Sequence, residues 1–208
     1  MAGGRKTVPR SARAPATSSI PSQSSTNGAW TPFAFTCCGN WTEAGFKSRY
    51  ASELANGLGN LVNRSLSMLK RYRNGVVPVR SDELSADAEK VIAETKSFLE
   101  QNELQKALQS IWSLVTRANQ YVDRTAPFKL AKDPAQAQRL DEVLYNLTET
   151  CRILAVLIWP YLPETAAKLN AQLGLPGEPN KFSAAVWGGL IAGHTIGEPA
   201  ALFPRKDG

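Results

Sequence analysis

The sequence predicts an all-α fold, an antiparallel bundle of four or five helices joined by short loops. Over most of residues 42–173, apolar residues recur at spacings of three and four, as on one face of a helix. Almost no stretch shows the alternation that is typical of a strand. Glycine and proline interrupt the helical pattern where helix ends are expected. The 208 residues suffice for one such domain with tails.

Two parts are expected along the chain. Residues 1–40 are rich in Ser, Thr, Ala, Pro and Gly, carry four basic and no acidic side chains, and lack a helical period. We therefore expect them to form a disordered basic tail. This composition also resembles an organelle transit peptide, and a mis-set start site is the simpler alternative. Residues 41–208 are expected to form the bundle, closed by a short irregular coda.

The first helix is expected over residues 42–73, because Asn74-Gly75 is a strong helix stop. The glycines at positions 57 and 59 indicate close helix–helix packing. The other side of this helix is unusual, because Asn56, Asn60 and Arg64 follow one another at four-residue spacing. We call these three residues the polar ladder, and such groups can recognise another polar molecule. The mostly apolar stripe consists of Leu54, Leu58, Leu61, Ser65, Leu69 and Tyr72.

Further helices are expected after this one. The second has Ser81 as its N-cap and breaks near Asn102, the third ends at Pro127, and the fourth starts at Pro134. A short last helix reaches Leu173. The expected inward residues of the third helix are Leu104, Ala107, Leu108, Ile111, Leu114, Val115, Ala118, Tyr121 and Val122. The expected inward residues of the fourth are Leu140, Val143, Leu144, Leu147, Cys151, Leu154 and Ile158. The expected anchors of the coda are Trp187, Leu190 and Leu202-Phe203-Pro204.

The formal net charge of +6 is unevenly distributed along the chain. Between Leu54 and Ser81 there is no carboxylate, but there are five basic side chains: Arg64, Lys70, Arg71, Arg73 and Arg80. One interpretation is a solvated helix end, which suits the helix macrodipole. The other is a local site for a polyanion, where phosphates supply affinity and amides supply selectivity.

Several site classes are excluded by composition. Cys37, Cys38 and Cys151 form neither a disulfide framework nor a zinc set, so a reducing, cytosol-like compartment is the default. The longest strongly apolar run, residues 153–159, is far below the ~20 residues that span a bilayer. His194 is the single histidine, and we expect it to be a loop residue. We expect no catalytic residue and no metal site.

One aromatic residue stands out after the third helix. Phe128 follows Pro127 and has no place in the apolar stripe that ends at Val122, so we expect its ring to be exposed. Most aromatic residues in such a position make a satellite core contact. Beside a polar ladder, however, an exposed ring can stack on an unpaired base, which is worth ~1–3 kcal/mol.

Residues from about Trp41 to Lys206 resemble the C-terminal anticodon-binding domain of methionyl-tRNA synthetase, a class I aminoacyl-tRNA synthetase. The resemblance rests on ELANGLGNLVNR (53–64), ANQY through TAPF (118–128) and LFPR (202–205), which match in order and spacing. It implies a bundle that binds the anticodon loop of methionine tRNA. Asn60 and Arg64 match the family's Asn and Arg on the first helix. Phe128 matches the loop aromatic that stacks on the wobble base, where the family usually has Trp.

The resemblance also implies binding partners and a catalytic domain that this sequence lacks. The family's catalytic Rossmann domain carries His-Ile-Gly-His and Lys-Met-Ser-Lys-Ser signatures, and this sequence has neither. We therefore expect a tRNA-binding part of a methionine–tRNA ligase that is inactive alone and holds no cofactor, since ATP and methionine would bind the catalytic domain. The expected partners are methionine tRNA and a catalytic synthetase domain or chain, not a membrane. The expected location is the cytoplasm, or an organelle if the tail is a transit peptide.

Arg71 and Arg73 are candidates for phosphate contacts. The main alternative is a helical scaffold or interaction protein that kept the fold and lost anticodon recognition, and a third is a complete enzyme of another type. Burial of Phe128 would favour the scaffold. Convergence of Asn60, Arg64 and Phe128 on one exposed cleft would favour RNA binding.

Overall fold

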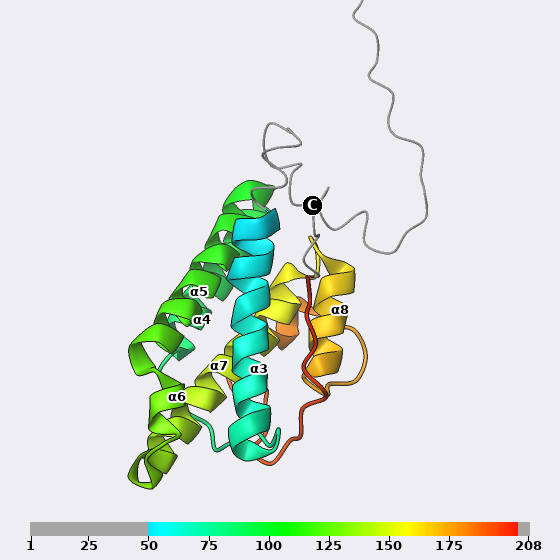
Figure 1. Ribbon diagram of the computed structural model, residues 1–208. Coiled ribbons are helices and arrows are strands. Elements are labelled where there is room, and N and C mark those ends of the chain that lie inside the picture. Colours follow the sequence, from blue (N-terminus) through cyan, green and yellow to red (C-terminus); the bar gives the residue numbers. More distant parts are fainter. Residues whose placement is uncertain (1–49, 204–208) are drawn as a thin grey trace, which may run out of the picture.

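Helix α7 (Ala137–Ile158) is the centre of the structure, because nearly every side chain from residue 143 to 158 is buried. A helix buried on all sides must be surrounded by other elements. Around α7 pack α3 (Asn60–Arg73), α4 (Ser85–Glu100), α5 (Leu104–Thr125) and α8 (Pro163–Gln172) (Figure 1). The predicted all-α bundle is confirmed.

The computed structural model describes residues 50–203, with side chains from residue 53 onward. The predicted disordered tail, the predicted start of the first helix near Thr42 and the predicted anchor Pro204 lie outside these residues. Before α3 lies a π-helical segment, η1 (Tyr50–Gly59), and short elements surround α7: α6 (Pro127–Leu130), η2 (Pro134–Gln136) and η3 (Phe182–Ala184). Within residues 50–203, extended pairing is limited to one isolated bridge between Val76 and Thr195. None of the helices described here is both long and apolar enough to cross a bilayer.

Most predicted helix ends are confirmed. Helix α3 ends at Arg73, followed by Asn74 and Gly75 with φ angles of 53° and 78°, the left-handed conformation that closes a helix. The apolar stripes are also confirmed: the predicted core residues of α7 are all buried, and those of α5 are buried except Leu104. Leu104 is 52% exposed, because it is the first residue of α5 and lies at the end of the bundle.

The predicted start of the second helix is wrong. Helix α4 begins at Ser85 rather than after Ser81, because Asn146 of α7 supplies the polar contacts there. The Asn146 amide oxygen accepts a hydrogen bond from the Leu84 N–H (3.0 Å), and its nitrogen donates to Ser81 Oγ (2.9 Å). A side chain from a distant helix therefore binds both Ser81 and Leu84 in the segment that precedes α4.

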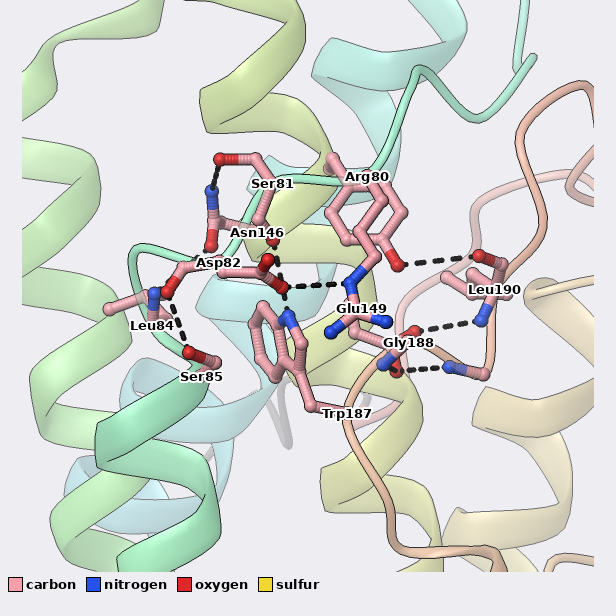
Figure 2. A network of polar contacts seen from close by, with 12 residues as sticks. Arg80, Ser81, Asp82, Leu84, Ser85, Asn146, Glu149, Trp187, Gly188 and Leu190 are labelled. Carbon is pink, nitrogen blue, oxygen red and sulfur yellow. Dashed lines mark hydrogen bonds and ion pairs between the residues drawn. The ribbon is translucent and has the colours of Figure 1, made fainter.

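The coda after α8 is fastened to the bundle by a buried polar network (Figure 2). The carboxylate of Glu149, which is 0% exposed, accepts hydrogen bonds from the backbone N–H groups of Gly188 (2.8 Å), Gly189 (2.8 Å) and Leu190 (3.1 Å). Arg152 pairs with Glu149 at 2.7 Å and also donates to two carbonyl groups of the coda.

Apolar anchors complete this attachment. The predicted anchors Trp187, Leu190, Leu202 and Phe203 are all buried, which confirms them. The Trp187 indole N–H also donates to the Ser81 carbonyl at 3.1 Å (Figure 2). The coda therefore joins α7 to the loop between α3 and α4.

Candidate nucleic-acid interface

The polar ladder lies on the outer face of η1 and α3. Asn56 and Asn60 are exposed, whereas Arg64 is half-buried. On the inner face, the stripe residues from Leu54 to Leu69 are buried in the core, and Tyr72 is partly buried against it. Amphipathic periodicity therefore places the amides toward solvent, as the sequence predicts.

Arg64 connects the ladder to the end of α5. Its Nη2 atom donates to Asp123 Oδ1 at 3.0 Å, with side-chain exposures of 32% for Arg64 and 70% for Asp123. About one turn earlier on α5, the Asn119 side chain donates to the Gly57 carbonyl at 3.3 Å. Two of the sequence stretches that carry the resemblance are thus in direct contact.

Phe128 follows this contact closely, five residues after Asp123. Helix α5 ends at Thr125, Ala126 takes a left-handed conformation (φ 45°), and the buried Pro127 starts α6. The turn leaves the Phe128 side chain 45% exposed, so the predicted exposure is confirmed. The alternative prediction, a satellite contact with the core, does not fit, because Phe128 is not among the residues packed against the core.

Folding neutralises most of the basic segment. Residues 54–81 contain no carboxylate, but Arg73 pairs with Asp141 of α7, and Lys70 pairs with Glu198 of the coda at 2.6 Å. Arg80 pairs with Asp82 at 2.8 Å, and Arg64 with Asp123. Three of these four carboxylates come from parts of the chain that are distant in sequence, so the composition of residues 54–81 overstates the local positive charge.

The two candidate phosphate contacts differ in their surroundings. Arg71 is exposed and makes no ion pair with any residue from 53 to 203, and its guanidinium lies 5.7 Å from the centre of the Tyr72 ring. Arg73 also donates to the carbonyl groups of Tyr72 (2.8 Å) and Ala137 (3.1 Å). The Arg73 side chain therefore ties α3 to α7, and its phosphate contact stays a prediction.

A charged cluster that the sequence did not indicate lies at the start of α7. Arg139 pairs with Glu83, from the loop before α4, and with Glu142. The hydrogen bond from Arg139 lowers the pKa of the Glu83 carboxyl. Burial raises the pKa of the nearby Tyr121 phenol. The ion pair between Arg139 and Glu83 holds the start of α7 against the loop before α4, and only the packed structure brings these residues together.

Other chemistry-bearing residues are built into the scaffold. In the part of the chain that the structure describes, no group of His, Cys, Asp and Glu side chains could hold a metal ion. His194 lies in the coda, as predicted, with Nε2 at 2.7 Å from the Leu173 carbonyl oxygen. Cys151 is fully buried, and this burial raises the pKa of its thiol to about 12. Such a thiol is not a nucleophile at neutral pH.

Comparison with known proteins gives a consistent result. A family model described as the anticodon binding domain of methionyl tRNA ligase matches residues 73–207. The methionine–tRNA ligase of Caldanaerobacter subterraneus subsp. tengcongensis is 37% identical over 166 residues, which cover 77% of this chain and 26% of the relative. The Bacillus subtilis methionine–tRNA ligase is 38% identical over 183 residues, 81% of this chain and 27% of the relative. The chain thus spans about a quarter of the length of these curated relatives.

A similar structure has also been solved. The apo, free-state crystal structure of Mycobacterium tuberculosis methionyl-tRNA synthetase matches with a TM-score of 0.78 and 30% sequence identity. The match covers 86% of this chain and 39% of that one. The helical arrangement in Figure 1 therefore occurs as one part of a longer polypeptide in this relative.

Proposed function

The chain belongs to the family of the anticodon-binding domain of methionyl-tRNA ligase, and from this premise we propose that it binds the anticodon loop of methionine tRNA. The observation that carries the proposal is the exposed ring of Phe128. Phe128 lies five residues after Asp123, and Asp123 is the residue at the end of α5 that contacts Arg64. Exposed aromatic and amide groups together with a partly exposed guanidinium suit single-stranded RNA, since an unpaired base offers a face for stacking and an edge for hydrogen bonds.

Each residue has a distinct role in this proposal. The Asn60 amide can both donate to and accept from a base edge, whereas Arg64 can only donate. Phe128 stacks on one base, in the role of the loop aromatic that the resemblance assigns to this position. Arg71 contacts a phosphate, because its guanidinium is exposed and makes no ion pair with a described residue. Arg73 is the second candidate for a phosphate contact.

We propose that the remaining functions of a methionine–tRNA ligase belong to a catalytic synthetase domain or chain. ATP and methionine would bind there, and the bundle would supply the tRNA. Protein synthesis in the cytoplasm is the proposed setting, with an organelle as the alternative. A scaffold without RNA binding is the competing function.

The direct test is binding to an RNA hairpin with the anticodon loop of methionine tRNA. We expect the chain to bind this hairpin more tightly than a hairpin in which only the anticodon is changed. A single mismatched contact of this kind is worth about 1–3 kcal/mol, which is roughly 5- to 150-fold in dissociation constant. Fluorescence anisotropy titrations at fixed salt would measure it. Equal binding to both hairpins would reject anticodon recognition, and no binding to either would favour the scaffold.

The role of Arg71 can be separated from base recognition. Arg71→Ala is expected to weaken binding to both hairpins by a similar factor, because a phosphate contact carries no sequence information. The plot of log affinity against log salt concentration should become shallower by ~0.7, the contribution of one phosphate contact to single-stranded RNA. Lys168→Ala, at an exposed position on α8, is the matched control and should change neither quantity. An unchanged salt slope in Arg71→Ala would exclude the contact.

A further inference from the structure

The helix that carries the polar ladder changes its winding at one point. Residues Tyr50–Gly59 are π-helical, and α-helical hydrogen bonding begins at Asn60. π-Helical winding is rare, occurs mostly as single turns within α-helices, and is frequently found at functional sites. The junction falls directly before Asn60, so whatever holds the junction also holds the turn that carries this side chain.

Helix α5 holds the junction on one side. The Asn119 side-chain nitrogen donates to the Gly57 carbonyl at 3.3 Å and to the Val115 carbonyl of its own helix at 3.0 Å. Both amide hydrogens are thus used, one to fix the Asn119 side chain and one to fix the backbone of η1. Asn119 belongs to a stretch that carries the resemblance, but the proposed contacts with RNA do not use it.

The coda holds the junction on another side. A Cβ atom on Gly59 would lie 3.0 Å from the Phe203 ring and 3.2 Å from the Leu54 carbonyl oxygen, so a larger residue would crowd this close approach. Phe203 is 8% exposed and Leu202 is 6% exposed. In Figure 1 the red end of the coda runs beside the upper half of the first helix. Two segments distant in sequence therefore meet at residues 57–59.

We infer that Asn119 and Phe203 are positioning residues for anticodon recognition: they hold the π-to-α junction and thereby fix the direction of the Asn60 amide. A slip of one residue in helical register rotates a side chain by about 100°. Such a slip would turn the residues on one side of the junction away from the face that carries Arg64. This inference rests on the proposed function, because Asn60 matters here only as a contact with RNA.

The test compares discrimination with stability in the full chain. Phe203→Ala and Asn119→Ala are each expected to reduce the ratio of affinities for the native and the changed anticodon hairpin by about tenfold, the value of one well-made contact. Phe203→Leu keeps an apolar side chain against Gly59 and should retain most of this ratio. Leu190→Ala removes a buried side chain from another part of the coda and is the matched control. It should lower the melting temperature and leave the ratio unchanged.

The outcomes are distinguishable. If the unmodified chain discriminates between the hairpins and both alanine variants discriminate equally well, the positioning role is wrong. If the unmodified chain does not discriminate, the proposed function itself fails. If Phe203→Ala does not fold, the affinity ratios of Asn119→Ala and Phe203→Leu test the positioning role instead. If Leu190→Ala loses the affinity ratio as much as the other variants do, the loss reflects general stability and the positioning role is wrong.

Discussion

Replacing Glu149 with glutamine is expected to lower the free energy of unfolding by about 3–5 kcal/mol, the usual cost of removing one partner of a buried ion pair. The Arg152 guanidinium, only 7% exposed, would lose its counter-charge. The amide of glutamine has one acceptor oxygen, where the carboxylate serves three backbone N–H groups of the coda as well as Arg152. Urea unfolding followed by circular dichroism would measure the change.

A matched variant separates burial from charge. Glu198→Gln removes the carboxylate of the exposed Lys70–Glu198 pair, in which Glu198 is 83% exposed. Exposed pairs contribute about 0–1 kcal/mol, so this variant should unfold almost as the unmodified chain does. Equal destabilisation by the two substitutions would mean that the network in Figure 2 does not hold the coda.

Replacing Phe128 with alanine is expected to weaken binding to the methionine anticodon hairpin by roughly 5- to 150-fold, which corresponds to the ~1–3 kcal/mol of one base–aromatic stack. Because the ring is 45% exposed, its removal should change the unfolding free energy far less than a core truncation would. Binding to a hairpin with a changed anticodon should fall less. Anisotropy titrations with both hairpins, beside a urea unfolding curve, would measure these effects.

A larger aromatic residue at position 128 is expected to strengthen binding to the hairpin. Phe128→Trp restores the residue that the family resemblance gives here and adds aromatic area for stacking, so binding to the native hairpin should tighten. A loss of stability in Phe128→Ala comparable to a core truncation would show that the ring supports the fold instead. Unchanged binding in both variants would exclude stacking.

The helical fold could be predicted because its information is local. Periodic apolar residues mark α5 and α7, and Asn74-Gly75 ends α3 where the sequence indicates. The start of α4 could not be predicted, because its N-terminal contacts come from Asn146, which is distant in sequence. The π-helical winding of η1 also left no periodic signal that distinguishes it from an ordinary helix.

The candidate site was predictable to a different extent. Asn60, Arg64 and Phe128 came from the ladder pattern and the family resemblance, and their roles in binding remain predictions. Ion pairing was not predictable from the basic segment, because Asp123, Asp141 and Glu198 reach it only after the helices pack. A sequence shows the charge of a segment, whereas the electrostatic potential at a surface depends on every neighbour in space.

The polar residues buried within α7 have a consequence for fold specificity. A central helix that is apolar on every side could pack in several rotations about its axis with similar burial of surface. Asn146 reaches its partners only when it faces the start of α4, and Glu149 only when it faces the coda. One rotation satisfies both side chains, and any other separates the buried carboxylate from its three backbone donors in the coda. Asn146 and Glu149 thus select one packing arrangement of α7 among those that the apolar side chains alone would allow.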